Sequence, residues 1–236
     1  MSRIIFITGT DTGVGKTTVA RLLLRHLRNS GINALAMKPF CSGGTDDLDA
    51  FRSIQGDELP RKILNPYYFP EPLAPAVARH ETARRITLKS VLATVKKAAR
   101  RCECLLVEGA GGLLVPVTRR MMVADIISAL KCDVIVVTRN QIGTLNHTLL
   151  TVEALRRRGI GRIKIVFSET KQTDASSKSN PQYLSEHLKN IGVYRIPQFS
   201  SRSHNELSKI TGAKKIKKTL AQICDPDTFS PRCSDR

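Results

Sequence analysis

Tryptophan is absent from this 236-residue chain, and aromatic residues make up only 5% of it. The core must therefore be aliphatic, and a hydrophobic content of 41% is sufficient for one and too high for a disordered chain. No apolar run approaches the roughly 20 residues that a membrane-spanning helix needs. The first residues lead directly into a strand-like segment. They lack the apolar stretch and small-residue cleavage site that a secretory signal has. We therefore expect a cytoplasmic protein that does not associate with membranes.

Acidic residues are scarce, because 20 Asp and Glu stand against 38 Lys and Arg and leave a net charge of +18. Such an excess attracts polyanions, including nucleic acids and nucleotides. The basic residues cluster in segments 96–101, 156–164 and 214–218, but no cluster is interleaved with aromatics or forms a known nucleic-acid-binding module. We interpret them as solvated surface and keep nucleic-acid binding as the alternative.

Paired cysteines are also missing. The six cysteines form no C-x-x-C pair or zinc-ligand spacing, and the five histidines are dispersed. In a cytosolic protein this pattern predicts free thiols, several of them buried.

Short β-branched segments alternate with longer helical patterns along the chain. We expect strands at 3–8, 34–38, 104–108, 133–138, 162–167 and 193–196, and helices at 16–29, 87–101, 123–130, 145–158 and 181–190. The nearly continuous apolar strands predict burial on both faces, hence a mainly parallel sheet flanked by helices on both faces. Ligands in this α/β architecture bind at the carboxyl ends of the strands.

Two segments depart from this alternation. Residues 65–75 hold four prolines, which excludes a regular helix and predicts an ordered excursion. Residues 225–236 are polar, and we expect a frayed, disordered tail after a single domain over 1–224.

A glycine-rich turn joins the first strand to the first helix, and residues 9–18 read GTDTGVGKTT. Glycines let backbone N–H groups approach phosphate oxygens, and the helix N-terminus adds partial positive charge. In such a loop Lys16 reaches the β- and γ-phosphates and Thr17 binds Mg²⁺. Gly9 stands one residue earlier than in the common form G-x-x-x-x-G-K-[ST], a modest departure. The pattern predicts a nucleoside triphosphate site, with a merely tight turn as the alternative.

Related nucleotide-binding classes are disfavoured by two absences. Partition-type ATPases carry a signature lysine near the start of this loop, where the chain has Asp11 and no lysine before Lys16. The guanine-binding motif N-K-x-D is absent as well.

Charged residues follow the second strand. Lys38 at its carboxyl end would lie near a bound γ-phosphate, although a surface lysine before a turn proline explains it equally well. Asp46, Asp47 and Asp49 come next. Carboxylates near a triphosphate are a source of Mg²⁺ ligands, while a helix N-cap is the alternative.

Glu108 ends the apolar strand at 104–108 and is followed by Gly109, Ala110, Gly111 and Gly112. A carboxylate at that strand end is the usual acidic residue on the metal side of a nucleotide-binding enzyme. The glycines permit close approach of the backbone to a ligand.

Five segments together resemble the dethiobiotin synthetase family, over about residues 3 to 170. They are GTDTGVGKT (9–17), KPFCSG (38–43), NPYYFPEPLAP (65–75), VEGAGGLLVP (107–116) and IGTLNHTLLT (142–151). The resemblance implies a single-domain P-loop NTPase fold. It also implies a ligase of biotin synthesis that uses ATP, CO₂ and Mg²⁺ to convert 7,8-diaminononanoate into the cyclic urea dethiobiotin. The route implied passes through a carbamate and a carbamic–phosphoric anhydride.

The same resemblance implies roles for individual residues. Lys16 and Lys38 are expected to be catalytic, and Thr17, Asp47 and Glu108 to hold Mg²⁺. The nucleotide is expected at Gly13, Val14, Gly15, Lys16, Thr17, Thr18, Asp47, Glu108, Gly109, Ala110, Gly111, Ser168, Glu169 and Pro197. The diamine or its carbamate is expected at Thr12, Ser42, Gly143, Thr144, Leu145 and Asn146.

Two details remain open. The spacing to Phe51 and Gly56 favours Asp47 as the metal ligand over Asp46 and Asp49. The family often has Asn where this chain has Ser168, which lacks the two-sided amide that reads adenine. We therefore expect loose selectivity for the nucleotide base.

The resemblance further implies a homodimer in which the helix start at 143–147 meets the substrate of the neighbouring subunit. Its N–H groups suit a carboxylate. The alternatives are another amidoligase-like P-loop ATPase and a basic nucleic-acid-binding NTPase. The former usually carries a glutamine amidotransferase domain, for which this chain has no room.

Overall fold

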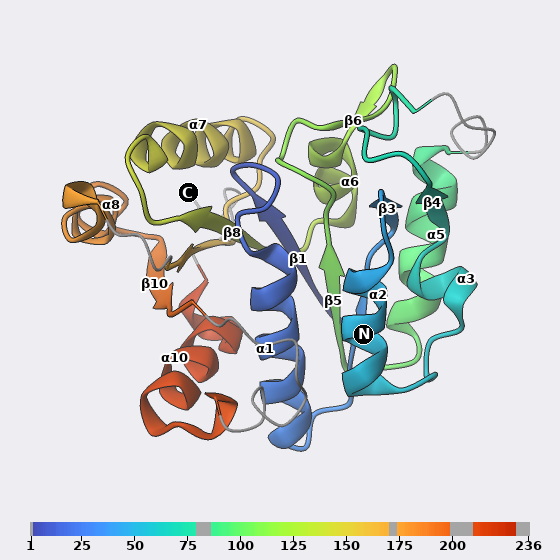
Figure 1. Cartoon of the computed structure of the whole chain (residues 1–236), viewed down its shortest axis with the longest axis horizontal. Coiled ribbons are helices and arrows are strands. Elements are labelled where there is room, and N and C mark those ends of the chain that lie inside the picture. Colours follow the sequence, from blue (N-terminus) through green and yellow to red (C-terminus); the bar gives the residue numbers. More distant parts are fainter. Residues whose placement is uncertain (1, 79–85, 170–173, 199–209, 230–236) are drawn as a thin grey trace.

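A six-stranded parallel sheet forms the centre of the computed structural model, which describes residues 2–78, 86–169, 174–198 and 210–229 (Figure 1). The strand order is β10-β9-β8-β1-β5-β2, and every neighbouring pair is parallel. The strands are β1 (Arg3–Gly9), β2 (Ala34–Met37), β5 (Cys104–Glu108), β8 (Asp133–Arg139), β9 (Ile163–Ser168) and β10 (Gly192–Ile196). This confirms the predicted α/β class and each predicted strand.

The core is aliphatic, as the lack of tryptophan requires. All four residues of β2 and all five of β5 are buried, because both strands lie inside the layers and are covered on both faces. The largest fully buried aromatic side chains are phenylalanines: Phe6, Phe51, Phe69 and Phe167.

Helices cover both faces of the sheet (Figure 1). The helix α1 (Lys16–Asn29) contacts β1, β2 and β5 and lies between α2 (Asp46–Gln55) and α10 (Lys214–Cys224). On the other face, α5 (Leu88–Ala99) contacts β5 and packs against α6 (Val123–Leu130). The remaining helices are α3 (Arg61–Leu64), α7 (Thr144–Arg156) and α8 (Asn180–His187). Within the described ranges, no helix has both the length and the apolar character needed to cross a membrane.

Sequence patterning predicted no helix for α2 and α10, and the structure contains both. In α2 only one narrow face is apolar, with Leu48, Phe51 and Ile54 buried. In α10 lysines fill the first two turns, and the buried residues come at its end. Helices this short are stabilised by tertiary packing rather than by a strong local pattern.

Small sheets complete the carboxyl edge. The strand β3 (Phe40–Ser42) pairs in parallel with β4 (Tyr67–Phe69), which belongs to the proline-rich segment 65–75. That segment is therefore ordered and non-helical, as predicted. The strands β6 (Pro116–Thr118) and β7 (Met121–Met122) form an antiparallel pair.

The C-terminal segment differs from the predicted frayed tail over residues 225–229. Residues Pro226–Thr228 form a 3₁₀ turn, and Phe229 is 5% exposed. The Nζ of Lys164 lies 3.9 Å from the Phe229 ring centroid, with the guanidinium carbon of Arg3 at 5.3 Å. Cation–π attraction and burial therefore hold these residues on the domain. Residues 230–236 lie outside the described part of the chain.

Candidate active site

The phosphate-binding loop lies between β1 and α1, at the carboxyl edge of the sheet. Gly13 and Gly15 adopt left-handed φ angles of 71° and 100°, which residues with a side chain rarely adopt. Gly9 is required sterically, because a Cβ there would lie 2.7 Å from Cγ2 of Val14. The Lys16 ammonium folds back and donates to the carbonyl of Asp11 at 2.8 Å. These contacts and backbone angles define the conformation of the loop.

Four polar side chains converge beside this loop. The Thr17 hydroxyl donates to Oε1 of Glu108 at 2.8 Å, and the Lys38 ammonium donates to the same oxygen at 2.8 Å. Lys38 also donates to Asp47 on α2. The structure therefore brings together residues from α1, β5, α2 and the end of β2, four segments that are distant in sequence.

Of the three aspartates, Asp47 is the one paired with Lys38. Asp49 is exposed and accepts a hydrogen bond from the Thr45 hydroxyl at 3.3 Å. Thr45 is the N-cap of α2, so the aspartates occupy the first helical turn, where carboxylates stabilise the helix. The acidic cluster therefore stabilises the start of α2 and also supplies Asp47 to the candidate site.

The charges in this cluster are strongly coupled. Glu108 is 1% exposed, and burial raises the pKa of its carboxyl, although Lys38 and the hydrogen bonds from Lys38 and Thr17 oppose this. Burial alone would lower the pKa of Lys38, but Glu108 and Asp47 together raise it. Burial lowers the pKa of Lys16 to about 8, with Glu108 opposing and Lys38 adding repulsion. The lysines therefore differ, since only Lys38 has paired carboxylates.

The cluster fits a hard cation such as Mg²⁺. Within the described part of the chain, the second carboxylate oxygen of Glu108, Oε2, is buried without a hydrogen-bond partner, so one acceptor is free for a ligand. Among the described residues no group of three or more His, Cys, Asp or Glu side chains is arranged to hold a metal alone. Mg²⁺ binds through one or two carboxylates together with phosphate oxygens, which Thr17, Asp47 and Glu108 would complement.

The glycines after Glu108 serve packing against the phosphate-binding loop. A Cβ on Gly112 would lie 3.3 Å from the carbonyl oxygen of Thr10, and one on Gly109 would lie 2.9 Å from the Phe6 ring. Gly111 has φ 58° and approaches the Thr12 hydroxyl. They bring the segment after β5 onto the loop and so place Thr12 close to that segment.

The predicted substrate residues at the start of α7 divide into two groups. The hydroxyl of Thr144 is buried and lies 2.7 Å from that of Thr138, which also accepts from Thr10 at 3.1 Å. This chain of hydroxyls joins the phosphate-binding loop to α7. Gly143 and Asn146 are exposed and Leu145 is half-buried. Thr144 therefore has a structural contact, while Asn146 is accessible from outside.

A small cleft of about 70 Å³ connects the two predicted substrate regions. Its lining includes Thr12 from the phosphate-binding loop together with Thr144 and His147 from α7. Ser42 lies elsewhere, at the half-buried end of β3.

The residues predicted to face the nucleotide base lie at the ends of β9 and β10. Ser168 lies against the phosphate-binding loop, because its Oγ is 2.6 Å from where a Cβ of Gly15 would stand. Glu169 accepts from Asn140 Nδ2 at 3.0 Å and from Arg195 Nε at 2.6 Å. Pro197 is exposed beyond β10.

Sequence reasoning missed two residues in this region. Asn140 is fully buried, and its amide binds Glu169, the carbonyl of Ser177 and the amide of Asn180. Arg139, at the end of β8, donates to the carbonyl of Gly13 from Nη2 at 2.7 Å and from Nε at 3.2 Å. Their place after a predicted parallel strand was the available signal, since ligand-contacting residues gather there.

Comparison with known proteins gives a consistent result. A family described as an AAA domain matches residues 3–205. The ATP-dependent dethiobiotin synthetase BioD of Anaeromyxobacter sp. (strain K) is 41% identical over 89% of this chain and 97% of that protein. The protein of the same name from Methanococcus vannielii is 40% identical over 70% of this chain and 78% of its own length.

A solved structure also shares the fold. The ParA family ATPase of Chlorobium tepidum TLS superposes with a TM-score of 0.62 over 94% of this chain and 98% of that protein, at 18% identity. This likeness concerns the fold alone.

Proposed function

This chain belongs to the ATP-dependent dethiobiotin synthetase family. On that basis we propose that it converts 7,8-diaminononanoate and CO₂ into the cyclic urea dethiobiotin and consumes ATP in doing so. One amine of the diamine takes up CO₂ as a carbamate, whose oxygen attacks the γ-phosphate. The second amine then closes the ring and releases phosphate. The observation that carries the proposal is the convergence of Lys16, Thr17, Lys38 and Glu108 beside the phosphate-binding loop.

Phosphoryl transfer needs positioning and neutralisation of charge more than a covalent nucleophile. Lys16 starts α1 beneath the loop, and Lys38 enters from the end of β2, so two cations reach the same place from different elements. Both are nearly buried, at 6% and 9% exposure, so their charges act in an environment with little water. Lys38 is held by two carboxylates and needs no reorganisation to stay charged.

We further propose that Mg²⁺ is the cofactor and that Thr17, Asp47 and Glu108 hold it with the nucleotide. When bound, the ion would neutralise phosphate charge. Glu108 is suited to this role because, among the residues that the structure describes, Oε2 has no hydrogen-bond partner. Thr17 is hydrogen-bonded to Glu108 and so is oriented toward the same place.

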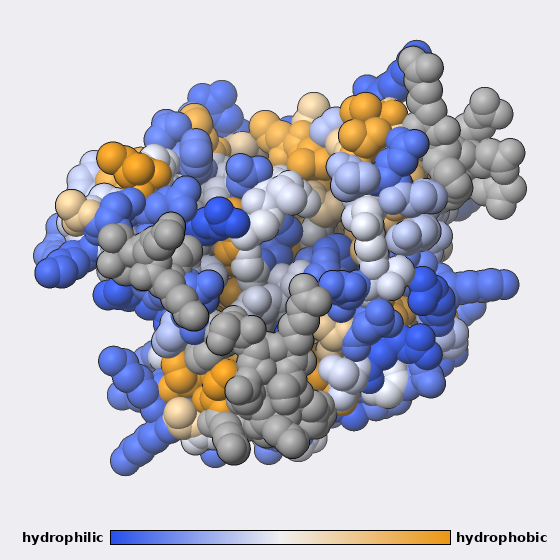
Figure 2. All heavy atoms as spheres, in the orientation of Figure 1, coloured by the Kyte–Doolittle hydropathy of each residue, from blue (hydrophilic) through white to orange (hydrophobic). Residues whose placement is uncertain are grey.

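A two-fold dimer completes this proposal. Figure 2 shows apolar surface at the upper edge of the molecule, around β6 and between β6 and α7. Exposed apolar side chains of these segments include Ile142 at 80%, Leu150 at 56% and Leu114 at 50%. Exposed apolar surface of this kind marks association sites. An isologous contact here would place the start of α7 against the neighbouring subunit. The cytoplasm as the compartment stays a prediction from the sequence.

The test is phosphate release from ATP with bicarbonate, measured with and without 7,8-diaminononanoate. We expect release to depend on the diamine and to match the cyclic urea formed. Diamine-independent hydrolysis stimulated by DNA at physiological salt would overturn the proposal and favour the nucleic-acid-binding alternative. Hydrolysis that responds to neither addition would leave only a P-loop ATPase.

A further inference from the structure

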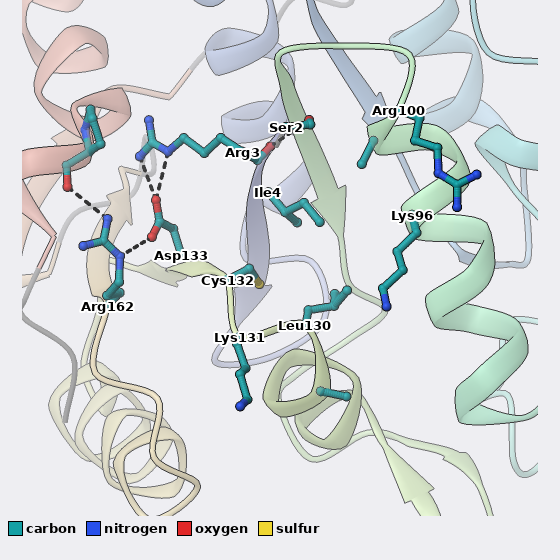
Figure 3. A pocket seen from close by; sticks show the side chains of 13 residues that line it. Ser2, Arg3, Ile4, Lys96, Arg100, Leu130, Lys131, Cys132, Asp133 and Arg162 are labelled. Atoms are coloured by element: carbon teal, nitrogen blue, oxygen red, sulfur yellow. Dashed lines mark hydrogen bonds and ion pairs between the residues drawn. The ribbon is translucent and has the colours of Figure 1, made fainter. Parts of the chain in front are cut away.

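A second cavity, of about 930 Å³, opens at the amino ends of the strands, on the opposite edge of the sheet from the phosphate-binding loop (Figure 3). It is lined by the starts of β1 and β8 and by the carboxyl ends of α5 and α6, with Arg162 and Pro226 closing one side. None of these residues takes part in the proposed reaction. The volume lies within the range of small-molecule sites, about 300–1,000 Å³.

The floor of this cavity is apolar. Figure 3 shows the side chains of Ile4 and Leu130 between two charged walls. Ala99 and Ala129 add further apolar surface. Cys132 also lines the floor, and burial raises the pKa of its thiol to about 12, so that it stays neutral. Such a floor suits an aliphatic or aromatic body rather than a bare ion.

One wall is fixed by a buried carboxylate between two arginines. Asp133 is 6% exposed and accepts from Arg3 Nε at 2.9 Å and from Arg162 Nε at 2.5 Å. Both ion pairs are visible in Figure 3. Because Asp133 is already engaged by both guanidinium groups, it does not neutralise the opposite wall.

The opposite wall carries cations without partners. Lys96 projects from α5 and Arg100 follows it directly, while Lys131 lies at the cavity edge just after α6 (Figure 3). Among the residues that the structure describes, none of these three side chains makes a hydrogen bond or an ion pair. Of the described residues that line the cavity, Asp133 is the only carboxylate, against five cationic side chains.

Helix ends explain only part of this charge. Arg100 and Lys131 are the C-caps of α5 and α6, where a helix presents about half a negative charge. Two such ends offset about one positive charge and leave an excess in the cavity. If these cations were only a solvated basic surface, no apolar floor of this size would be needed beside them.

We propose that this cavity binds a small amphipathic organic anion, with its apolar body over Ile4 and Leu130 and its anionic head between Lys96 and Arg100. Carboxylate and phosphate heads share the chemistry that these cations recognise. The proposal is independent of the reaction at the other edge of the sheet.

The test is calorimetric titration of the full chain with octanoate and, separately, with octyl phosphate. Saturating Mg²⁺ and a non-hydrolysable ATP analogue keep the phosphate-binding loop occupied. Octylammonium and inorganic phosphate are the controls for an apolar body with the wrong charge and for a head without a body. We expect one molecule of at least one amphipathic anion to bind, and neither control to bind comparably.

Two variants locate the site. Lys96→Glu should weaken binding at least tenfold, whereas Lys97→Glu, an equally exposed change on the same helix outside the cavity, should leave it unchanged. Ala129→Phe, which enlarges an exposed apolar side chain of the lining without altering charge, should also weaken it. Absence of binding by both amphiphiles, equal binding of inorganic phosphate, or equal effects of the Lys96 and Lys97 variants would overturn the proposal.

Discussion

At the scale of single residues, one buried oxygen organises the candidate active site. Oε1 of Glu108 accepts from both Thr17 and Lys38, while Oε2 has no hydrogen-bond partner among the residues described by the structure. A carboxylate in this position is costly to bury unless cations face it. Lys38 stabilises the buried carboxylate, and in the proposed reaction it would also supply charge for the transferring phosphoryl group.

Replacing Lys38 by Gln should lower kcat by about 100- to 1,000-fold, the usual effect of removing one preorganised electrostatic stabiliser. The KM for ATP should change much less, since the interaction strengthens mainly in the transition state. Lys38 lowers the pKa of Glu108, so its removal should raise that pKa. The acidic limb of the pH–rate profile should therefore move to higher pH.

The matched control is Lys62→Gln, which alters an exposed lysine of α3 outside the site. Steady-state kinetics and circular dichroism of both variants separate catalysis from folding. Near-normal turnover of the Lys38 variant would remove its catalytic role.

Nucleotide binding should depend on pH through Lys16, whose pKa burial lowers to about 8. Bound phosphate would raise that pKa, so binding takes up a proton above about pH 8 and affinity falls as pH rises. Below this range affinity should be nearly constant. Calorimetry in two buffers of different ionisation enthalpy measures the uptake, and Lys16→Arg, which does not titrate, should abolish it. A dissociation constant that is flat from neutral to alkaline pH contradicts this assignment.

Selectivity for the base should be loose, with comparable kcat/KM for ATP, CTP and GTP. Ser168 lies against Gly15, and the carboxylate of Glu169 is engaged by Asn140 and Arg195. Among the described residues of this region, few side-chain groups are free to read a base edge. A strict preference for ATP would show that backbone groups read the base.

At the scale of elements, a buried lysine fastens the last helix to the sheet. Lys164 on β9 is fully buried, and its ammonium donates to the carbonyls of Gln222, Ile223 and Asp225 at 2.7, 2.9 and 2.8 Å. These carbonyls lie at or just beyond the end of α10, where backbone acceptors lack helical partners. All three N–H donors of the ammonium are used.

Replacing Lys164 by Met should lower the free energy of unfolding by about 2 kcal/mol or more, because buried carbonyls lose a charged donor. For a domain of this size that corresponds to a fall in Tm of about 4–8 °C. Thermal and urea unfolding would measure it. Lys215→Met, at an exposed position of α10, should change stability by less than about 0.5 kcal/mol. Equal stability of the two variants would show that α10 docks by apolar contact alone.

At the scale of the whole molecule, the two edges of the sheet differ in character. The carboxyl edge holds the nucleotide site and the exposed apolar surface around α7, whereas the amino edge holds the basic cavity. An interface at the carboxyl edge would leave the amino edge open to solvent.

Replacing Leu150 by Glu should dissociate the proposed dimer, since it places a charge on apolar surface that is 56% exposed in one subunit. The KM for the diamine should rise more than the KM for ATP if α7 completes the neighbour's substrate site. Light scattering after size-exclusion chromatography and steady-state kinetics measure the two effects.

Ile32→Glu is the matched control, at an apolar residue 37% exposed just before β2 on the amino edge. Asn146→Ala should raise the diamine KM while leaving the dimer intact. A fully active monomer would exclude a shared substrate site.

Local pattern sufficed for much of the architecture. Consecutive apolar residues in β5 and β8 predicted strands buried on both faces, and α1 and α6 begin and end where the sequence indicated. The loop 9–18 was recognisable because its glycines and Gly-Lys-Thr end are themselves the phosphate-binding device. Such features can be predicted from the sequence because they depend on residues that are close together in the chain.

The sequence by itself therefore determined the α/β class, the strand sequence and the phosphate-binding loop of this protein. Spacing already favoured Asp47 over Asp46 and Asp49 as the metal ligand, but only the tertiary structure decided that Asp47 pairs with Lys38. It also decided that Thr144 turns inward to Thr138 and that Phe229 packs against Lys164. Each of these contacts depends on how elements distant in sequence pack against one another. Such contacts are selected by burial and pairing of charges across the fold, which local propensity does not encode.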